Sequence, residues 1–255
     1  MTRTTEHDIR RAADRMAHDL TRRVADEPAV RATLRRGVGR RVEDPAMLPL
    51  HGFVTPYLGD LHERARPRRF PDQGEAVERA FYAVAALIAA QSRQARDRDS
   101  AGADDGREHT GESPAEAPGG EDAATPASVG EPAAAGDTGE TPPRDRGLGT
   151  TLGEAVGKGR LNADTTEQRL HLLCRQSLDG VHAQLPRLLA HATAKGVRPD
   201  WGRLVLDLAR WGGERDHVAK EWAQGFHRAI GRARQAASQN STQTDTQSIE
   251  EVSTV

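Results

Sequence analysis

The chain has 255 residues, a formal net charge of −2 and a mean hydropathy of −0.71. Only 36% of its residues are hydrophobic and 4% are aromatic, which limits how much of the chain can form a packed core. No stretch approaches the roughly 20 apolar residues of a transmembrane helix, and the N-terminus lacks the apolar segment of a secretory signal. Because Cys174 is the only cysteine, an intrachain disulfide is excluded. We therefore expect a soluble, cytoplasmic protein that does not contact a membrane.

Apolar residues recur at steps of three and four along most of the chain, which is the pattern of amphipathic helices. In chain order, the pattern predicts helices at residues 6–27, 29–38, 72–96, 148–156, 165–177 and 181–194, with short pieces around the prolines between residues 45 and 56. No alternation typical of a strand exceeds four residues. The sequence therefore predicts an all-α fold, with an N-terminal helical domain at residues 1–96 and a C-terminal helical bundle at residues 147–236.

Between these two domains, residues 97–146 are dominated by small, polar and acidic residues, without an aromatic residue or a run of large aliphatic ones. Such a segment buries too little apolar surface to offset its ordering entropy, so we predict a long disordered acidic linker. The net charge is +5 for residues 1–96, −9 for residues 97–146 and +5 for residues 147–236. Residues 237–255 carry −3 and are predicted to form a flexible tail. Two basic domains point to a polyanionic partner, and the acidic linker is then expected to compete for their basic faces. The alternative is that the linker only keeps the protein soluble.

The three tryptophans mark a helical hairpin in the C-terminal bundle. Apolar residues from Trp201 to Trp211 lie on one stripe, with Asp200 as the predicted N-cap. After Gly212-Gly213, a second helix carries Trp222. We expect these aromatic residues to pack in one core rather than to bind a ligand.

Sequence patterns that might carry catalysis or bind a cofactor fail in detail. The glycines of residues 147–159 lack both the spacing of a phosphate-binding loop and a preceding strand. His171 and Cys174 lie three apart on one helix face, but a structural zinc site normally takes four ligands. We therefore predict no catalytic residue, metal or cofactor, and keep a metal-dependent or thiol enzyme using His171 and Cys174 as an alternative hypothesis.

Basic residues form the stronger functional signal. Arg35 and Arg36 begin a turn with four arginines, Lys158 and Arg160 lie in a loop, and three further arginines follow on the next helices, namely Arg169, Arg175 and Arg187. Guanidinium groups bind phosphate in bidentate fashion, so this clustering favours contacts to a nucleic-acid backbone. Few aromatic residues are available for stacking on bases, so binding should be independent of sequence.

Four strings carry a family resemblance: Leu34-Arg35-Arg36-Gly37; Tyr82 to Leu87; Thr151-Leu152-Gly153 leading to Gly159-Arg160-Leu161-Asn162; and Leu185 to Leu189 through Asp200-Trp201 to Trp211-Gly212. In residue identity and order along the chain, these strings resemble the CasB family, the small subunit of the type I-E CRISPR surveillance complex Cascade. The resemblance covers about residues 15–92 and 147–230.

Membership would imply a non-catalytic, all-helical subunit of a ribonucleoprotein that stabilises the R-loop along a basic path for the displaced DNA strand. The implied partners are the large subunit, the backbone subunits, a second copy of the chain, crRNA and target DNA. Position by position, the resemblance implies nucleic-acid contacts for Arg36, Arg169, Arg175 and Arg187, with Arg35, Lys158 and Arg160 as neighbours. The alternative is a helical DNA-binding regulator that acts alone, although Gly-Gly after a tryptophan is a poor turn for groove insertion.

Overall fold

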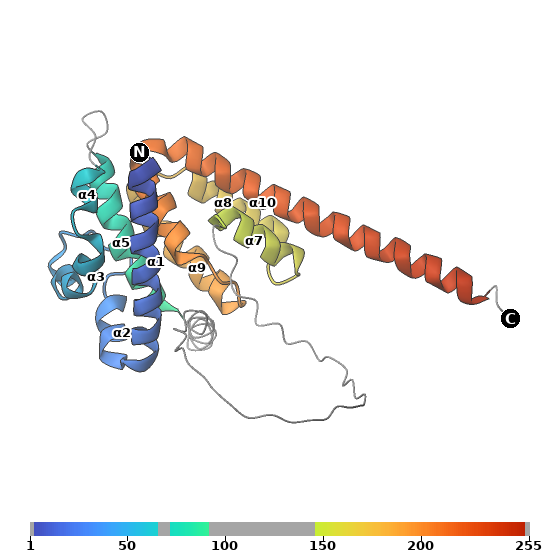
Figure 1. The fold of residues 1–255 in the computed structure, drawn as a ribbon, viewed down its shortest axis with the longest axis horizontal. Coiled ribbons are helices and arrows are strands. Elements are labelled where there is room, and N and C mark those ends of the chain that lie inside the picture. Colours follow the sequence, from blue (N-terminus) through green and yellow to red (C-terminus); the bar gives the residue numbers. More distant parts are fainter. Residues whose placement is uncertain (1–2, 66–71, 92–145, 253–255) are drawn as a thin grey trace, which may run out of the picture.

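The computed structural model describes residues 3–65, 72–91 and 146–252, and every regular element in these ranges is a helix (Figure 1). The all-α prediction is therefore confirmed. The predicted acidic linker lies outside the described residues except for Arg146. We call residues 3–91 the N-terminal unit and residues 146–252 the C-terminal unit. Among the described helices, none is long and apolar enough to cross a membrane.

The N-terminal unit is built around α5 (Asp72–Ala90), which contacts all its other helices. These are α1 (Arg3–Asp26), α2 (Pro28–Arg35), α3 (His51–Leu58) and α4 (Leu61–Arg64), with the 3-10 helix η1 (Pro45–Leu50) before α3. From Ala76 to Ala89, nearly every apolar side chain of α5 is buried, as expected of a helix that is apolar all round. Its alanines let several neighbouring helices approach closely.

Two details of the N-terminal unit differ from the sequence predictions. The helix predicted at residues 29–38 ends at Arg35, because the chain turns through Gly39, whose φ of 72° suits glycine. The short helix α4 was not predicted, since four residues are too few to show a helical period. The predicted apolar side of α1 is buried, including Ile9, Met16 and Leu20.

The C-terminal unit contains α7 (Leu148–Gly157), α8 (Ala163–Cys174), α9 (Leu178–Ala194) and α10 (Trp201–Val252). Side chains cap three of these helices at their N-termini. Asn162 Oδ1 accepts from Thr165 N at 3.0 Å, Ser177 Oγ from Gly180 N at 3.3 Å, and Asp200 Oδ1 from Arg203 N at 2.8 Å. The predicted N-cap at Asp200 is thus confirmed.

A sharp kink divides α10 after Gly212-Gly213, where Glu214 has φ −131° and ψ 30°. The Nε1 of Trp222 donates to Asp207 Oδ2 at 2.7 Å, although a straight helix would separate residues 15 apart by about 22 Å. The rings of Trp211 and Trp222 lie 5.0 Å apart. The two halves therefore pack on each other, which confirms the predicted hairpin. Its second helix runs on to Val252, through most of the segment predicted to be a flexible tail.

Glycines on α7 let this helix lie directly on the backbone of α10 (Figure 1). A Cβ on Gly149 would come within 1.8 Å of the carbonyl oxygen of Trp222, and one on Gly153 within 2.5 Å of that of Phe226. Gly149 and Gly153, first considered as part of a phosphate-binding loop, are therefore a packing surface, whereas Gly159 lies in the turn after α7 with a φ of 69°.

The two units are joined by one continuous apolar core and by ion pairs. Arg10 Nη2 lies 2.8 Å from Asp200 Oδ2, and Arg210 Nε lies 4.0 Å from Glu6 Oε1. Asp179 of α9 accepts from both Arg41 and Arg79 of the N-terminal unit. We call this boundary the seam.

Candidate nucleic-acid interface

All seven basic residues predicted to bind nucleic acid are exposed. Arg35 ends α2 and Arg36 is its C-cap, while Lys158 is the C-cap of α7 and Arg160 follows in the next loop. Arg169 lies on α8, Arg175 is the C-cap of that helix, and Arg187 lies on α9. We call these seven residues the α9 basic set. Arg187 lies on α9 itself, and Arg175 lies three residues before its start.

Five members of the α9 basic set have no partner among the residues that the structure describes. Across residues 3–65, 72–91 and 146–252, no hydrogen bond or ion pair engages the guanidinium groups of Arg35, Arg36, Arg169, Arg175 and Arg187. Arg160 Nη1 donates to the carbonyl oxygen of Gly196 at 3.1 Å. Five arginines thus retain their full capacity to bind phosphate oxygens.

The N-terminal end of α9 gathers residues from both units. Asp179, in the first turn of α9, accepts from Arg41, which belongs to the turn that begins with Arg35 and Arg36. Arg175 lies four residues before Asp179. The contact therefore brings the basic turn of the N-terminal unit next to the corner between α8 and α9, which sequence spacing alone does not predict.

The other end of α9 is linked to the second basic loop. The bond from Arg160 to Gly196 holds the loop of Lys158 and Arg160 against the residues that follow α9. With 17 residues, α9 is about 25 Å long, and Arg187 lies about 12 Å along it from Asp179. The α9 basic set thus supplies cations at both ends and in the middle of one helix.

One carboxylate of the seam, Asp179, is paired with two arginines. Arg79, followed by Arg41, holds the pKa of Asp179 below its usual range. Burial, with a smaller contribution from the charge of Arg79, lowers the pKa of His182 to about 3, so its imidazole is neutral at physiological pH. Arg41, Arg79 and Asp179 thus link the two units and together carry a net charge of +1, with Arg79 buried and Arg41 exposed.

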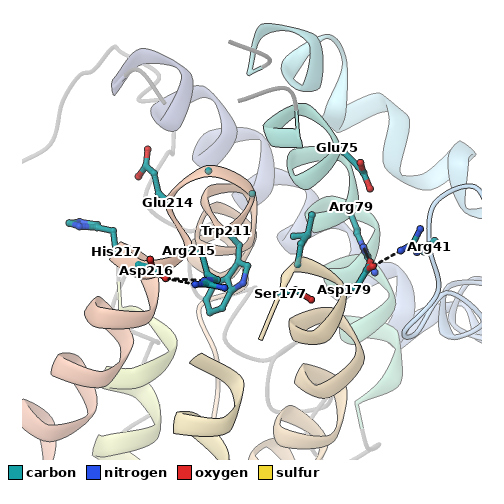
Figure 2. A pocket seen from close by; sticks show the side chains of 13 residues that line it. Arg41, Glu75, Arg79, Ser177, Asp179, Trp211, Glu214, Arg215, Asp216 and His217 are labelled. Carbon is teal, nitrogen blue, oxygen red and sulfur yellow. Dashed lines mark hydrogen bonds and ion pairs between the residues drawn. The ribbon is translucent and has the colours of Figure 1, made fainter. Parts of the chain in front are cut away.

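A cavity of about 670 Å³ opens at the seam, between α5, the start of α9 and the kink of α10 (Figure 2). Its lining carries both signs of charge, with Arg79 directed at Asp179 and Arg215 paired with its neighbour Asp216. None of the α9 basic set lines this cavity. The cavity is therefore distinct from the predicted nucleic-acid surface.

The hypothesis of a thiol enzyme or of a site shared by His171 and Cys174 finds no support in the geometry. Cys174 Sγ points to the carbonyl oxygen of Ala219, 3.6 Å away, and burial raises the pKa of this thiol to about 11. The thiolate that catalysis or metal binding needs is thus disfavoured. His171 instead lies near Glu167 and His227. Neither of these two residues was predicted as a ligand from the sequence. The spacing of Glu167 and His171 was a usable signal, whereas His227 comes from α10.

Comparisons with known proteins agree with the resemblance described above. Residues 30–227 match the family described as CRISPR-associated protein Cse2. A chain from a "CRISPR RNA-guided surveillance complex" is similar with 39% identity and a TM-score of 0.63, covering 90% of this chain and 99% of its own. A chain from a "CRISPR RNA-guided surveillance complex, pre-nicking" has 40% identity and a TM-score of 0.65 with the same coverage. No curated protein matches.

The family match spans most of the chain, and the structural matches include nearly the whole of each solved chain. Cse2 and CasB are two names for one subunit. The chain therefore belongs to the CRISPR-associated protein Cse2 family, the small subunit of type I-E Cascade.

Proposed function

We propose that this chain stabilises crRNA-guided binding of target DNA within Cascade, as a non-catalytic subunit that holds the displaced DNA strand along the α9 basic set. The observation that carries the proposal is the group of five exposed guanidiniums without a partner in the described protein. Exposed cations at both ends and in the middle of a 17-residue helix suit an extended polyanion better than a small ligand.

The chemistry of the surface favours contacts to phosphates over the reading of bases. Trp201, Trp211 and Trp222 are buried, so none of the tryptophans is available to stack on a base. Arginine on a helix surface contacts backbone phosphates irrespective of sequence. This fits a subunit that accompanies any displaced strand while the guide RNA selects the target.

The proposed partners follow from the family and from the matched complexes. We expect the chain to assemble with the large subunit, the backbone subunits, crRNA and a second copy of itself. The protonated thiol of Cys174 and the compensated charges of the cavity support a structural rather than a catalytic role.

The test is the salt dependence of target-DNA binding by a reconstituted complex. In the complex that carries Arg36→Ala, Arg169→Ala, Arg175→Ala and Arg187→Ala, four phosphate contacts are lost. The slope of log K against log salt should then fall by about 2.8, at about 0.7 per contact to a single strand.

A matched control removes four exposed arginines elsewhere that also lack an ion pair in the described structure, namely Arg15, Arg22, Arg228 and Arg234. This variant changes the net charge equally and should leave most of the slope intact. Equal slopes for the two variants would mean that overall charge, and not the α9 basic set, governs binding. Assembly of both complexes is verified first by co-purification with crRNA.

A further inference from the structure

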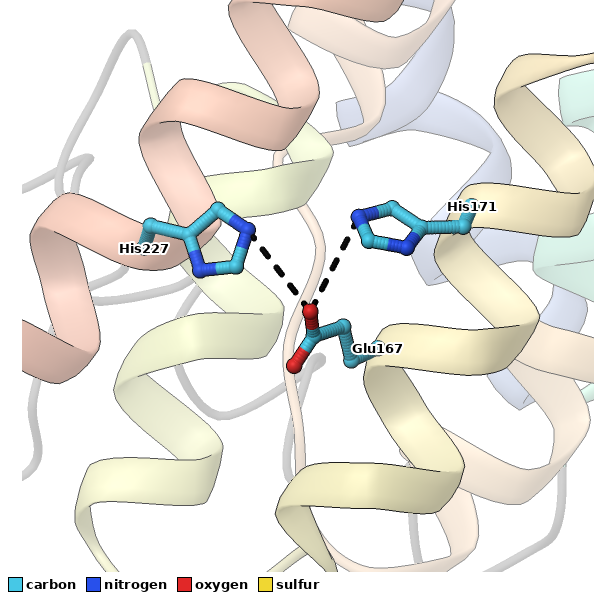
Figure 3. A group of neighbouring side chains, drawn as sticks. All are labelled: Glu167, His171 and His227. Carbon is cyan, nitrogen blue, oxygen red and sulfur yellow. Dashed lines mark ion pairs between the residues drawn. The ribbon is translucent and has the colours of Figure 1, made fainter.

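Three polar side chains converge at the edge of the contact between α8 and α10, outside the α9 basic set (Figure 3). Glu167 and His171 come from α8 and His227 from α10. Glu167 Oε1 lies 3.9 Å from Nε2 of His171 and 3.9 Å from Nε2 of His227. One ligand atom from each of the three residues lies within 4.8 Å of the other two.

The backbones on both sides of this cluster are held by packing. Leu170 and Leu173 of α8 are buried, as is Phe226, next to His227 on α10. The ring of Phe226 meets that of His227 edge to face, with centroids 5.5 Å apart. Glu167 and His171 are four residues apart and share one helix face. The three side chains are thus brought together by the fold while their ends stay accessible, at 38%, 49% and 54% exposure for Glu167, His171 and His227.

Hydrogen bonding does not explain this convergence. A separation of 3.9 Å exceeds the range of a hydrogen bond between nitrogen and oxygen. Within the parts of the chain that the structure describes, the three side chains form no hydrogen bond with any other group. The carboxylate and the two imidazoles therefore face one another at ion-pair distance, with one potential ligand atom each.

Two imidazoles and one carboxylate are the donors of zinc sites that keep a position open to water. Tetrahedral coordination at 2.0–2.2 Å places ligand atoms roughly 3.3 Å apart, so each 3.9 Å gap has to close by about 0.6 Å. Rotation of exposed side chains supplies such a shift. Mg²⁺ and Ca²⁺ prefer oxygen ligands and fit this set poorly.

We propose that Glu167, His171 and His227 form a binding site for zinc or a similar divalent transition-metal ion that joins α8 to α10. The site is independent of the proposed DNA contacts. Its effect is mechanical, because α8 carries Arg169 and has Arg175 as its C-cap, and a metal bridge to α10 restricts the movement of the helix that presents them.

Zinc titration of the full chain, dialysed against a chelator, tests the proposal by calorimetry. We expect one equivalent of Zn²⁺ to bind, and the melting temperature to rise with zinc. Each of His227→Ala, His171→Ala and Glu167→Gln should weaken binding at least about 10-fold, the smallest loss seen when even an outer-shell partner is removed. Co²⁺ in place of zinc gives an absorption spectrum that reports the coordination geometry.

The control is a second His and Glu pair on one helix. His217 Nε2 lies 2.9 Å from Glu221 Oε1 on α10. Among the described residues, no third possible ligand lies close to both of them. His217→Ala should retain the full zinc affinity, and so should Cys174→Ser, because that thiol points to Ala219. Absence of stoichiometric binding, or an equal loss in His217→Ala, would overturn the proposal.

Discussion

Arginines with largely buried side chains and arginines of the α9 basic set differ in what surrounds them. The side chains of Arg79, Arg203 and Arg210 are 7%, 19% and 10% exposed, and each contacts a carboxylate. Arg36 and Arg187 are exposed and contact no carboxylate in the described part of the chain. Around a largely buried arginine, removing either charge leaves its partner without a counter-ion, whereas on the surface water already solvates the side chain. The same residue type therefore serves stability in one region and is available for ligands in the other.

The largest expected effect is at Asp207, which is fully buried and accepts from both Arg203 and Trp222. Asp207→Ala should lower the free energy of unfolding by about 3–5 kcal/mol, as measured by urea denaturation. Burial raises the pKa of this carboxyl while Arg203 and Trp222 oppose the shift, so Asp207→Asn, which still accepts from Trp222, should cost less.

Asp216 provides the control for that change, because it is 88% exposed and, among the described residues, pairs only with its neighbour Arg215. Asp216→Ala should change the free energy of unfolding by less than about 0.5 kcal/mol. Similar losses of unfolding free energy for Asp207→Ala and Asp216→Ala would contradict the distinction between buried and surface charges.

An intermediate effect is expected from the buried His182 beside Arg79. Burial lowers its pKa in the folded chain to about 3, below the ordinary histidine pKa of about 6.5, so between these values the unfolded chain binds a proton that the folded chain does not. The neutral His182 therefore costs no stability above pH 6.5. The free energy of unfolding decreases as the pH falls from 6.5 towards 3. At pH 5.5 the loss is about 1.4 kcal/mol.

His182→Leu should therefore flatten the acid side of the stability profile between pH 7 and 5.5, while the same change at the exposed His191 should not. Urea midpoints over that range provide the measurement. An unaltered profile in His182→Leu would show that other groups of the seam determine its acid sensitivity.

The smallest effect on stability is expected in the α9 basic set. Each of Arg36→Ala, Arg169→Ala and Arg187→Ala should shift the free energy of unfolding by less than about 0.5 kcal/mol, because no described partner is left behind. Denaturation of the isolated chain measures this. A loss like that of Asp207→Ala would identify the arginine as a structural residue and withdraw it from the proposed DNA path.

Much of the helical fold was predictable because its signals are local. The apolar period of α1, the N-cap at Asp200 and the glycines before the kink each lie within a few residues of the feature they specify. The length of α10 was not predictable, since residues 237–252 lack an apolar stripe. Nor was the bond between Trp222 and Asp207, because it depends on the angle of the kink.

In the candidate site, too, features with a local sequence signal were predictable and features that depend on long-range contacts were not. Composition and clustering identified the arginines, and the structure shows them exposed. Which arginines are neutralised depends on contacts such as Arg41 with Asp179, between residues far apart in sequence. His227 was missed for the same reason, because its neighbours on α8 are brought to it only by the packing of α8 on α10.

The glycines of α7 carry a consequence for how sequences of this fold can drift. At most buried positions, apolar residues of different size can replace one another with some repacking. At Gly149 and Gly153 every other amino acid adds a Cβ that collides with main-chain atoms of α10. No substitution of a neighbouring side chain removes those main-chain atoms. These two positions should therefore tolerate fewer alternatives than the tryptophans do, and they offer a stricter mark for recognising distant relatives.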